Sequence, residues 1–117
     1  MDIEAYRNHC LSKKGVTEEF PFDESTLVFK VMGKMFALTN VDKFEQFNVK
    51  CDPEKAIELR EKHSGVIPGY HMSKKHWNTV LMDGTISDID ACSWIDDSYN
   101  LVVKSLPKRL REELTGL

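Results

Sequence analysis

The sequence predicts an α+β fold: an antiparallel sheet of about five strands with helices packed on one face, in the order α-β-β-β-α-β-β-α-α. Segments with helix-capping residues are interspersed with short runs rich in β-branched and aromatic residues. Consecutive strand runs are joined by short links, which favour antiparallel hairpins over parallel crossovers. The chain has 117 residues, so we expect one domain over residues 1–117, with one hydrophobic core.

Helix start signals define the helical segments. Asp2 precedes a run with apolar residues at helical spacing, and Asp52 followed by Pro53 is a strong N-terminal signal. Ser87 or Asp88 can cap the longest helix. We therefore expect helices over residues 2–14, 53–63, 88–106 and 108–114.

Strand signals fill the segments between these helices. We expect strands over residues 27–31, 35–39, 44–49, 66–70 and 77–82. Gly33 and Lys34 form a tight turn between the first two, which indicates an antiparallel hairpin. Residues 18–24 are too irregular for an element, so we expect a loop there whose rings, Phe20 and Phe22, cover the core.

The charges balance overall but are segregated along the chain. There are 16 basic and 19 acidic residues, giving a net charge of -3, so the composition is not that of a strongly basic nucleic-acid binder. No acidic residue occurs between Lys62 and Met82, whereas five aspartates and no basic residue occur over residues 83–97. Local clusters of this kind can still attract phosphate groups.

Cysteine usage and hydropathy bear on the compartment. The three widely spaced cysteines, Cys10, Cys51 and Cys92, do not suggest a disulfide framework. No apolar run approaches the length of a membrane span, and the acidic N-terminus is unlike a signal peptide. We expect a reduced, cytoplasmic protein that does not associate with membranes.

The segment from Pro68 to Thr79 concentrates polar and aromatic groups. As a nucleic-acid surface, it would use Lys74 and Lys75 for phosphates and Tyr70 and Trp77 for stacking. The plainer interpretation is a hairpin that exposes the two lysines while the two aromatic rings cover the core.

Signals for catalysis or cofactors are weak. His71 and His76 are five residues apart, which is not the spacing of a helical metal-binding pair, so no metal site is expected. Cys51 precedes a helix, whose dipole can lower a thiol pKa, but free cysteines are usually small buried hydrophobes. With no Ser-His-Asp order or Gly-rich phosphate loop, we expect no cofactor, and enzymatic activity is not indicated.

Residues 68–80 resemble the PGYHMNKxHWNTV signature of the MmcQ/YjbR family, formerly a domain of unknown function. Ser73 stands where the family often has Asn, and it can still bond the turn backbone. Residues 29–31, 34–38, 48–53, 98–102 and 106–108 match as well. The resemblance therefore spans nearly the whole chain.

This resemblance implies a compact fold similar to the frataxin, or CyaY-like, architecture. The family is described as predicted DNA-binding proteins with a double-wing motif, whose hairpins would map to residues 27–39 and 66–82. Iron binding is not implied, because the first helix has only Asp2 and Glu4 before a basic end.

Two main hypotheses follow. In the first, the protein binds DNA, with phosphate contacts from Lys34, Lys50, Lys74, Lys75, Lys108 and Arg109. In the second, it binds a small molecule or peptide in a pocket shaped by Tyr70, His71, His76, Trp77 and Asn78. A protein-interaction module is a third possibility. His71 and Trp77 around a cavity would favour the pocket, and a flush, lysine-flanked ridge would favour DNA. The sequence leaves the oligomeric state open, with a monomer favoured.

Overall fold

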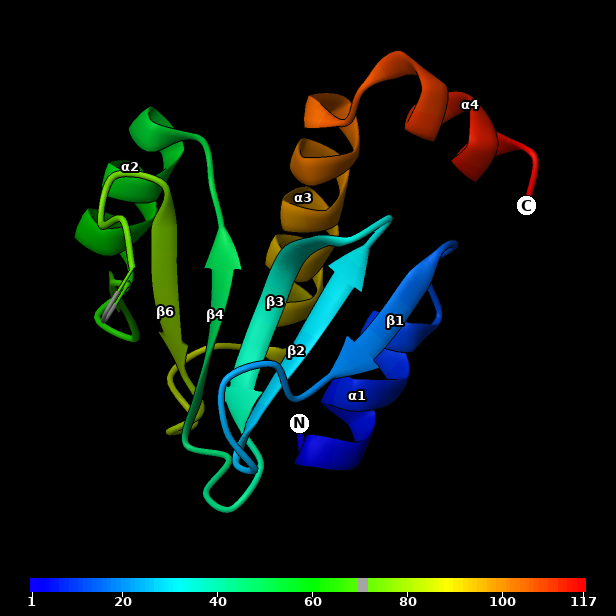
Figure 1. The fold of residues 1–117 in the computed structure, drawn as a ribbon. Helices are drawn as coiled ribbons and strands as arrows, with labels where there is room; N and C mark the ends of the chain where they lie inside the picture. Colours follow the sequence, from blue (N-terminus) through cyan, green and yellow to red (C-terminus); the bar gives the residue numbers. More distant parts are fainter. Residues whose placement is uncertain (70–71) are drawn as a thin grey trace.

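The computed structural model describes residues 1–69 and 72–117 (Figure 1). The elements are α1 (Ile3–Leu11), β1 (Val16–Glu19), β2 (Thr26–Val31), β3 (Lys34–Asn40), β4 (Gln46–Lys50), α2 (Pro53–Lys62), β5 (Val66–Pro68), β6 (Trp77–Leu81), α3 (Asp88–Ser105) and α4 (Lys108–Thr115). The described strands form one sheet in the order β1-β2-β3-β4-β6-β5, and all neighbouring pairs are antiparallel.

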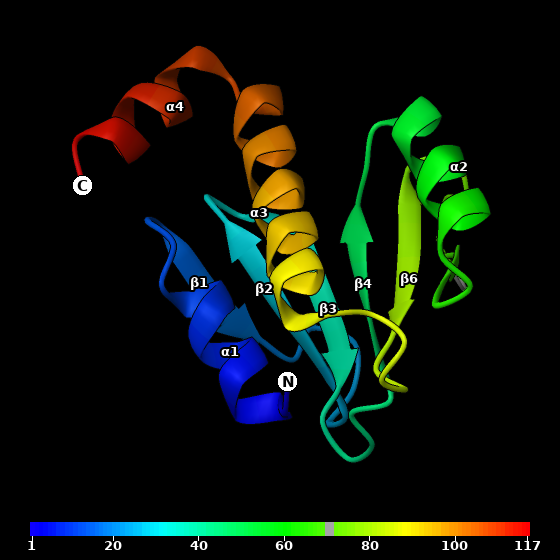
Figure 2. The same cartoon turned by 180° about the vertical axis from the view of Figure 1, so that it is seen from behind.

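The helices α1, α2 and α3 lie on one face of this sheet, as the view from behind shows (Figure 2). No helix of residues 1–69 and 72–117 lies on the other face, which is turned toward the viewer in Figure 1. The predicted α+β class, with an antiparallel sheet and helices on one face, is confirmed. None of the helices in the described ranges is long and apolar enough to span a bilayer.

The sheet has one strand more than the sequence predicted. β1 pairs with β2 from Val16 opposite Val31 to Glu19 opposite Val28, where the sequence suggested only a loop from residue 18 onward. The strand is a short edge strand whose glutamates give it no apolar alternation of its own, so only pairing with β2 defines it. The expectation that Phe20 and Phe22 cover the core was wrong: their exposed fractions are 50% and 66%.

The main core lies between the sheet and the helices. The fully buried Tyr6 of α1 packs edge-on against Phe29 and at a tilt against Phe44 and Phe47, with ring centroids 5.6, 5.1 and 5.1 Å away. Aromatic contacts at these separations add to the free energy gained from burial. Tyr6 of α1 therefore fills the position in the core that the sequence predicted for Phe20 and Phe22.

Three helix starts agree with the sequence. The side chain of Asp2 accepts a hydrogen bond from Ala5 N, that of Asp52 from Glu54 N and Lys55 N, and that of Ser87 from Asp90 N. These caps satisfy backbone donors that the first helical turn leaves unpaired. α1 ends at Leu11, three residues before the expected end, and the chain then turns through Gly15 at φ +75°.

A β-bulge in β3 fixes how the sheet meets α3. Phe29 pairs with Ala37 and Lys30 with Met35, so Phe36 is an extra residue in β3. Both Phe36 and Ala37 consequently belong to the core on the helix side. The buried Ser98 of α3 holds this bulge, since its Oγ donates a 2.6 Å hydrogen bond to Phe36 O. The same Oγ accepts a 2.8 Å bond from Lys50 N at the end of β4.

We predict that Ser98→Ala lowers the free energy of unfolding by about 1–3 kcal/mol, because the buried Phe36 O and the part-buried Lys50 N lose their partner. Ser93→Ala is the matched control, since Ser93 lies on the same helix but is exposed. Urea denaturation followed by circular dichroism measures both variants. Equal stability of the two variants would contradict this role of Ser98.

Candidate functional site

The face of the sheet without helices has a small apolar cluster of its own. Val28 of β2, Leu38 of β3 and Trp77 of β6 are buried there, and the half-buried Met35 and Met72 pack against them. Val28 and Leu38 are register partners, so they share a face of the sheet. We call this side the open face; β2, β3 and β6 carry apolar side chains on it where a fully solvated sheet face would be polar.

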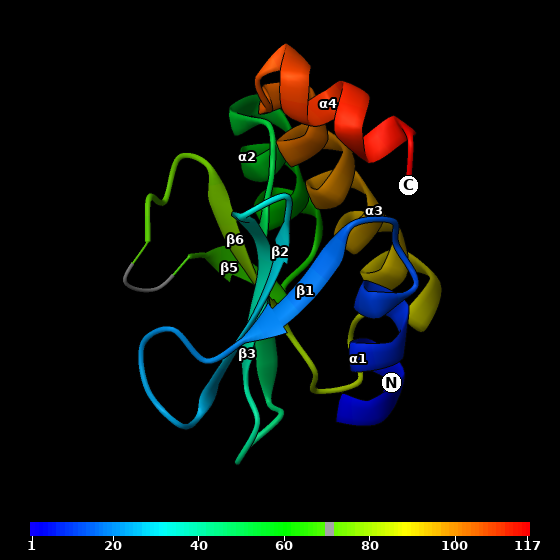
Figure 3. The same ribbon diagram turned by 45° about the vertical axis from the view of Figure 1, so that its right-hand side comes forward.

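A groove with a volume of about 710 Å³ crosses the open face. It is lined by Phe22, Asp23, Thr26, Met35, Leu38, Thr39, Asn40, Gln46, Asn48, Met72, Ser73 and Trp77. Figure 3 shows the sheet closer to edge-on, with the β1–β2 loop and residues 72–76 before β6 projecting away from the helices. The first of these loops contributes Phe22 and Asp23 to the groove, and the second contributes Met72 and Ser73.

Amide side chains form the polar part of the groove. Thr79 Oγ1 donates a 2.6 Å hydrogen bond to Asn48 Oδ1, which fixes the orientation of the Asn48 amide. Within the described residues, neither Asn48 Nδ2 nor the side-chain amide of Gln46 forms a hydrogen bond. These groups can therefore donate to, or accept from, a ligand that lies on the apolar cluster.

Asp23 holds one rim of the groove in place. Its carboxylate accepts hydrogen bonds from Thr26 N at 2.6 Å, Ser25 N at 2.9 Å and Thr26 Oγ1 at 3.2 Å. The backbone bond from Thr26, followed by those from Ser25 N and the Thr26 hydroxyl, lowers the pKa of Asp23 below its usual value. This rim therefore carries a negative charge at neutral pH.

Three of the predicted phosphate-binding residues, Lys50, Lys74 and Lys75, lie near the Trp77 end of the groove, whereas Lys34 pairs with Val31, a residue of the helix-side core. Lys50 ends β4 opposite Trp77, and Lys74 and Lys75 are exposed in the segment before β6. Lys34 is exposed at the start of β3. In the part of the chain that the structure describes, none of these four lysines forms an ion pair.

The other two predicted phosphate-binding residues lie elsewhere. Lys108 and Arg109 begin α4, which follows α3 on the helix side of the molecule (Figure 3). The Lys108 Nζ is 3.9 Å from a carboxylate oxygen of Glu112 on the same helix. The structure therefore does not gather all six predicted residues on one surface.

The five predicted pocket residues are divided between environments. Tyr70 and His71 lie outside the described residues. Trp77 lines the groove, but Asn78 points to the helix side, where its Nδ2 donates to Ala56 O at 3.3 Å. The half-buried His76 contributes its backbone carbonyl, which accepts a 2.7 Å bond from Cys51 N. Neighbouring strand residues point to opposite faces, so Trp77 and Asn78 cannot share a site.

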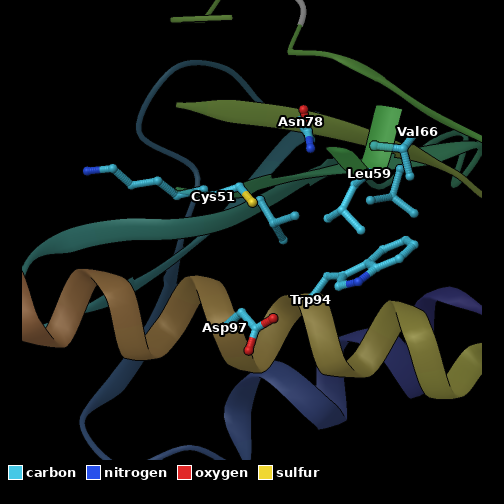
Figure 4. Close-up of a pocket in the computed structure, with 9 residues that line it drawn as sticks. Cys51, Leu59, Val66, Asn78, Trp94 and Asp97 are labelled. Carbon is cyan, nitrogen blue, oxygen red and sulfur yellow. The ribbon is translucent and has the colours of Figure 1, made fainter. Parts of the chain in front are cut away.

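A second, much smaller cavity lies on the helix side (Figure 4). Its volume is about 10 Å³, which is room for one water molecule at most. It is lined by Val49, Lys50, Cys51, Leu59, Val66, Asn78, Val80, Trp94 and Asp97. No organic ligand fits there without movement of α2 or α3.

The cysteines show no sign of activation. Burial raises the pKa of Cys51 even though the helix α2 begins two residues later, so the small-hydrophobe interpretation of this residue fits best. Burial also raises the pKa of Cys10 to about 12. Across the described ranges, no three His, Cys, Asp or Glu side chains are grouped so that they could hold a metal ion.

Comparison with known proteins identifies the family. The family model described as YjbR matches residues 11–101. The chain belongs to the YjbR family. The uncharacterized protein YjbR of Escherichia coli K12 is 33% identical over 118 residues and covers 100% of both chains. The uncharacterized protein YbdF of Escherichia coli O157:H7 is 41% identical over 91 residues, an alignment that covers 77% of this chain and 75% of YbdF.

Solved structures share the YjbR fold. A crystal structure of a Deinococcus radiodurans protein with the domain DUF419 superposes with a TM-score of 0.89 at 40% identity, covering 97% of this chain and 87% of its own. A crystal structure of a Pseudomonas syringae protein gives a TM-score of 0.73 at 29% identity, covering 86% of this chain and 98% of its own. The architecture is therefore that of the YjbR family.

Sequence reasoning found Trp77 but missed most residues around it in this YjbR-family protein. Met35, Leu38 and Asn48 come from strands that were treated as framework, and Phe22 was assigned to the core. The sequence did carry a signal for the apolar open face. Met35, Phe36, Ala37 and Leu38 are consecutive apolar residues of β3, and such a run indicates a strand that is buried on both faces. Only the register and the bulge show that Met35 and Leu38 share the open face.

We predict that Asp23 titrates below the ordinary value of about 3.9 for aspartate. A depressed native pKa means that the stabilisation of the rim is present above the unfolded pKa and is lost as the pH falls through the native one. Nuclear magnetic resonance titration of the Asp23 carboxyl carbon and of the Ser25 and Thr26 amides should give one shared midpoint. A carboxyl midpoint at or above the ordinary value would contradict the hydrogen-bonded geometry.

Proposed function

We propose that this YjbR-family protein binds a small, partly apolar organic ligand in the groove of the open face. The observation that carries the proposal is the position of Trp77 in a groove of about 710 Å³. Ligand sites in proteins commonly have volumes of about 300–1,000 Å³, with apolar walls and a few polar groups that fix orientation. The direction of Trp77 favours a pocket over a lysine-flanked ridge.

The arrangement of the lining residues suits an amphipathic ligand. Trp77, Leu38 and Met35 offer an apolar surface, and methionine adapts to ligands of different shape. The amides of Gln46 and Asn48 lie on β4, beside this surface. An apolar group can therefore pack on the cluster while a polar group bonds the amides, and the exposed Phe22 can cover the ligand from the rim.

The three described cysteines are free, and none forms a disulfide. Free thiols suit a reducing compartment, so we propose a cytoplasmic location.

We predict that the uncharged fluorescent probe N-phenylnaphthylamine binds the wild-type protein and that Met35→Glu weakens its binding about tenfold or more. The new carboxylate would have to lose water beside an apolar ligand. Ile89→Glu makes the same chemical change at an exposed residue of α3, and it should leave the affinity unchanged. Fluorescence titration measures all three proteins, and circular dichroism checks that each is folded.

Failure of the wild-type protein to bind this probe, or equal weakening by the two variants, would overturn the proposed groove function. A short extended peptide that displaces the probe would place the natural ligand in the peptide class. The groove would then still be the binding site.

Nucleic acid is the second candidate ligand, because Lys34, Lys50, Lys74 and Lys75 carry no ion-pair partner among the described residues. Positive charges of this kind can contact phosphates. The β2–β3 hairpin, one of the two proposed wings, lies in the middle of the sheet and ends in a turn at Met32 and Gly33. Contacts from this wing would therefore come from its turn and from Lys34.

If the protein binds DNA through these lysines, a fluorescent random-sequence duplex should bind with micromolar affinity that falls as salt rises. Lys74→Glu with Lys75→Glu should abolish binding. The control, Lys43→Glu with Lys62→Glu, changes the net charge equally at two other exposed lysines. No binding at low salt, or equal losses in both double variants, would remove this candidate.

A further inference from the structure

We propose that the ligand of the open-face groove carries an anionic group, which Lys50, Lys74 and Lys75 bind at the Trp77 end. This inference rests on the proposed function, because it names the chemical class of ligand for the same groove. The ligand would be an amphipathic organic anion whose apolar part packs on Trp77 and whose carboxylate, sulfonate or phosphate meets the lysines.

Lys50 is placed by the sheet register. It is the partner of Trp77 in the antiparallel pair of β4 and β6. Directly opposed residues lie on one face of a sheet, with Cβ atoms about 4.5–5.5 Å apart. Lys50 borders the small helix-side cavity and does not line the groove itself, but it is half-buried, forms no ion pair in the described ranges and lies opposite Trp77. We therefore expect its long side chain to reach an anion bound beside the indole ring.

Lys74 and Lys75 are placed by the backbone before β6. Ser73 O accepts hydrogen bonds from His76 N at 3.2 Å and Trp77 N at 2.9 Å, which closes a turn directly against the groove. Arg60 of α2 anchors this turn, because its Nη1 donates a 3.1 Å bond to Lys74 O. The two exposed lysines therefore lie in a turn held at both sides, next to the groove residue Ser73.

The charges of the two rims are opposite. Asp23 is the only charged residue that lines the groove within the described chain, and it belongs to the β1–β2 rim. At the Trp77 end, the described residues of the turn include two lysines and no acidic residue. A ligand anion is attracted to the lysine end and repelled from Asp23, so the charge pattern also fixes the direction in which the ligand lies.

The test compares two probes that share a scaffold. Anilinonaphthalene sulfonate carries a sulfonate, and N-phenylnaphthylamine has nearly the same ring system without it. We predict that the wild-type protein binds the sulfonate about tenfold more tightly, a difference of about 1.4 kcal/mol. Fluorescence titration at low ionic strength gives both dissociation constants, and the quantity of interest is their ratio.

The triple variant Lys50→Gln, Lys74→Gln, Lys75→Gln should bring this ratio to about one, since glutamine keeps side-chain length but removes the charge. The matched control replaces Lys14, Lys62 and Lys104 by Gln, which removes three exposed charges from the turn after α1, from α2 and from α3. Its ratio should equal that of the wild type.

The outcomes separate the two proposals. If the uncharged probe binds and the sulfonate binds no more tightly, the anion proposal fails while the groove function stands. If the ratio falls equally in both triple variants, the preference comes from net charge and the anion site fails again. If neither probe binds the wild-type protein, the groove function itself fails.

Discussion

The hydroxyl of Ser98 joins the three parts of the molecule on which the groove depends. It donates to Phe36 O in the bulge of β3 and accepts from Lys50 N at the end of β4, so it ties α3 to two central strands at once. The bulge that it holds turns Phe36 and Ala37 to the same side. Met35 and Leu38 therefore share the open face although they are three residues apart, where regular alternation would place them on opposite faces.

The two faces of the sheet are stabilised to different extents. The helix side has a large continuous core that includes the rings around Tyr6. Among the described residues, the apolar cluster of the open side has three buried members, Val28, Leu38 and Trp77, with Met35 and Met72 packed against them. The helix-side core can supply most of the free energy of folding through the apolar area that it buries. The open face is thus free to keep an incompletely covered apolar surface, as the proposed ligand binding would require.

Local signals in the sequence were sufficient for the helices and for most of the sheet. The caps at Asp2, Asp52 and Ser87 depend on contacts within one turn, so they can be recognised from neighbouring residues. β1 could not be predicted in this way, because Val16–Glu19 becomes a strand only by pairing with β2. The groove is still less local, since the β1–β2 loop, β2, β3, β4 and the end of the β5–β6 connection all contribute to it.

The segment that best matches the family signature serves both faces of the sheet. Asn78 bonds α2 through Ala56 O and Val80 enters the main core, whereas Trp77 and Thr79 turn to the open face. One strand therefore attaches α2 and builds the wall of the groove through alternate residues. The density of distinctive residues in this segment thus has two physical causes. Of these four residues, only Trp77 and Thr79 face the groove side of the sheet. The helix-side residues Asn78 and Val80 attach β6 to α2 and to the main core, and this attachment positions the strand.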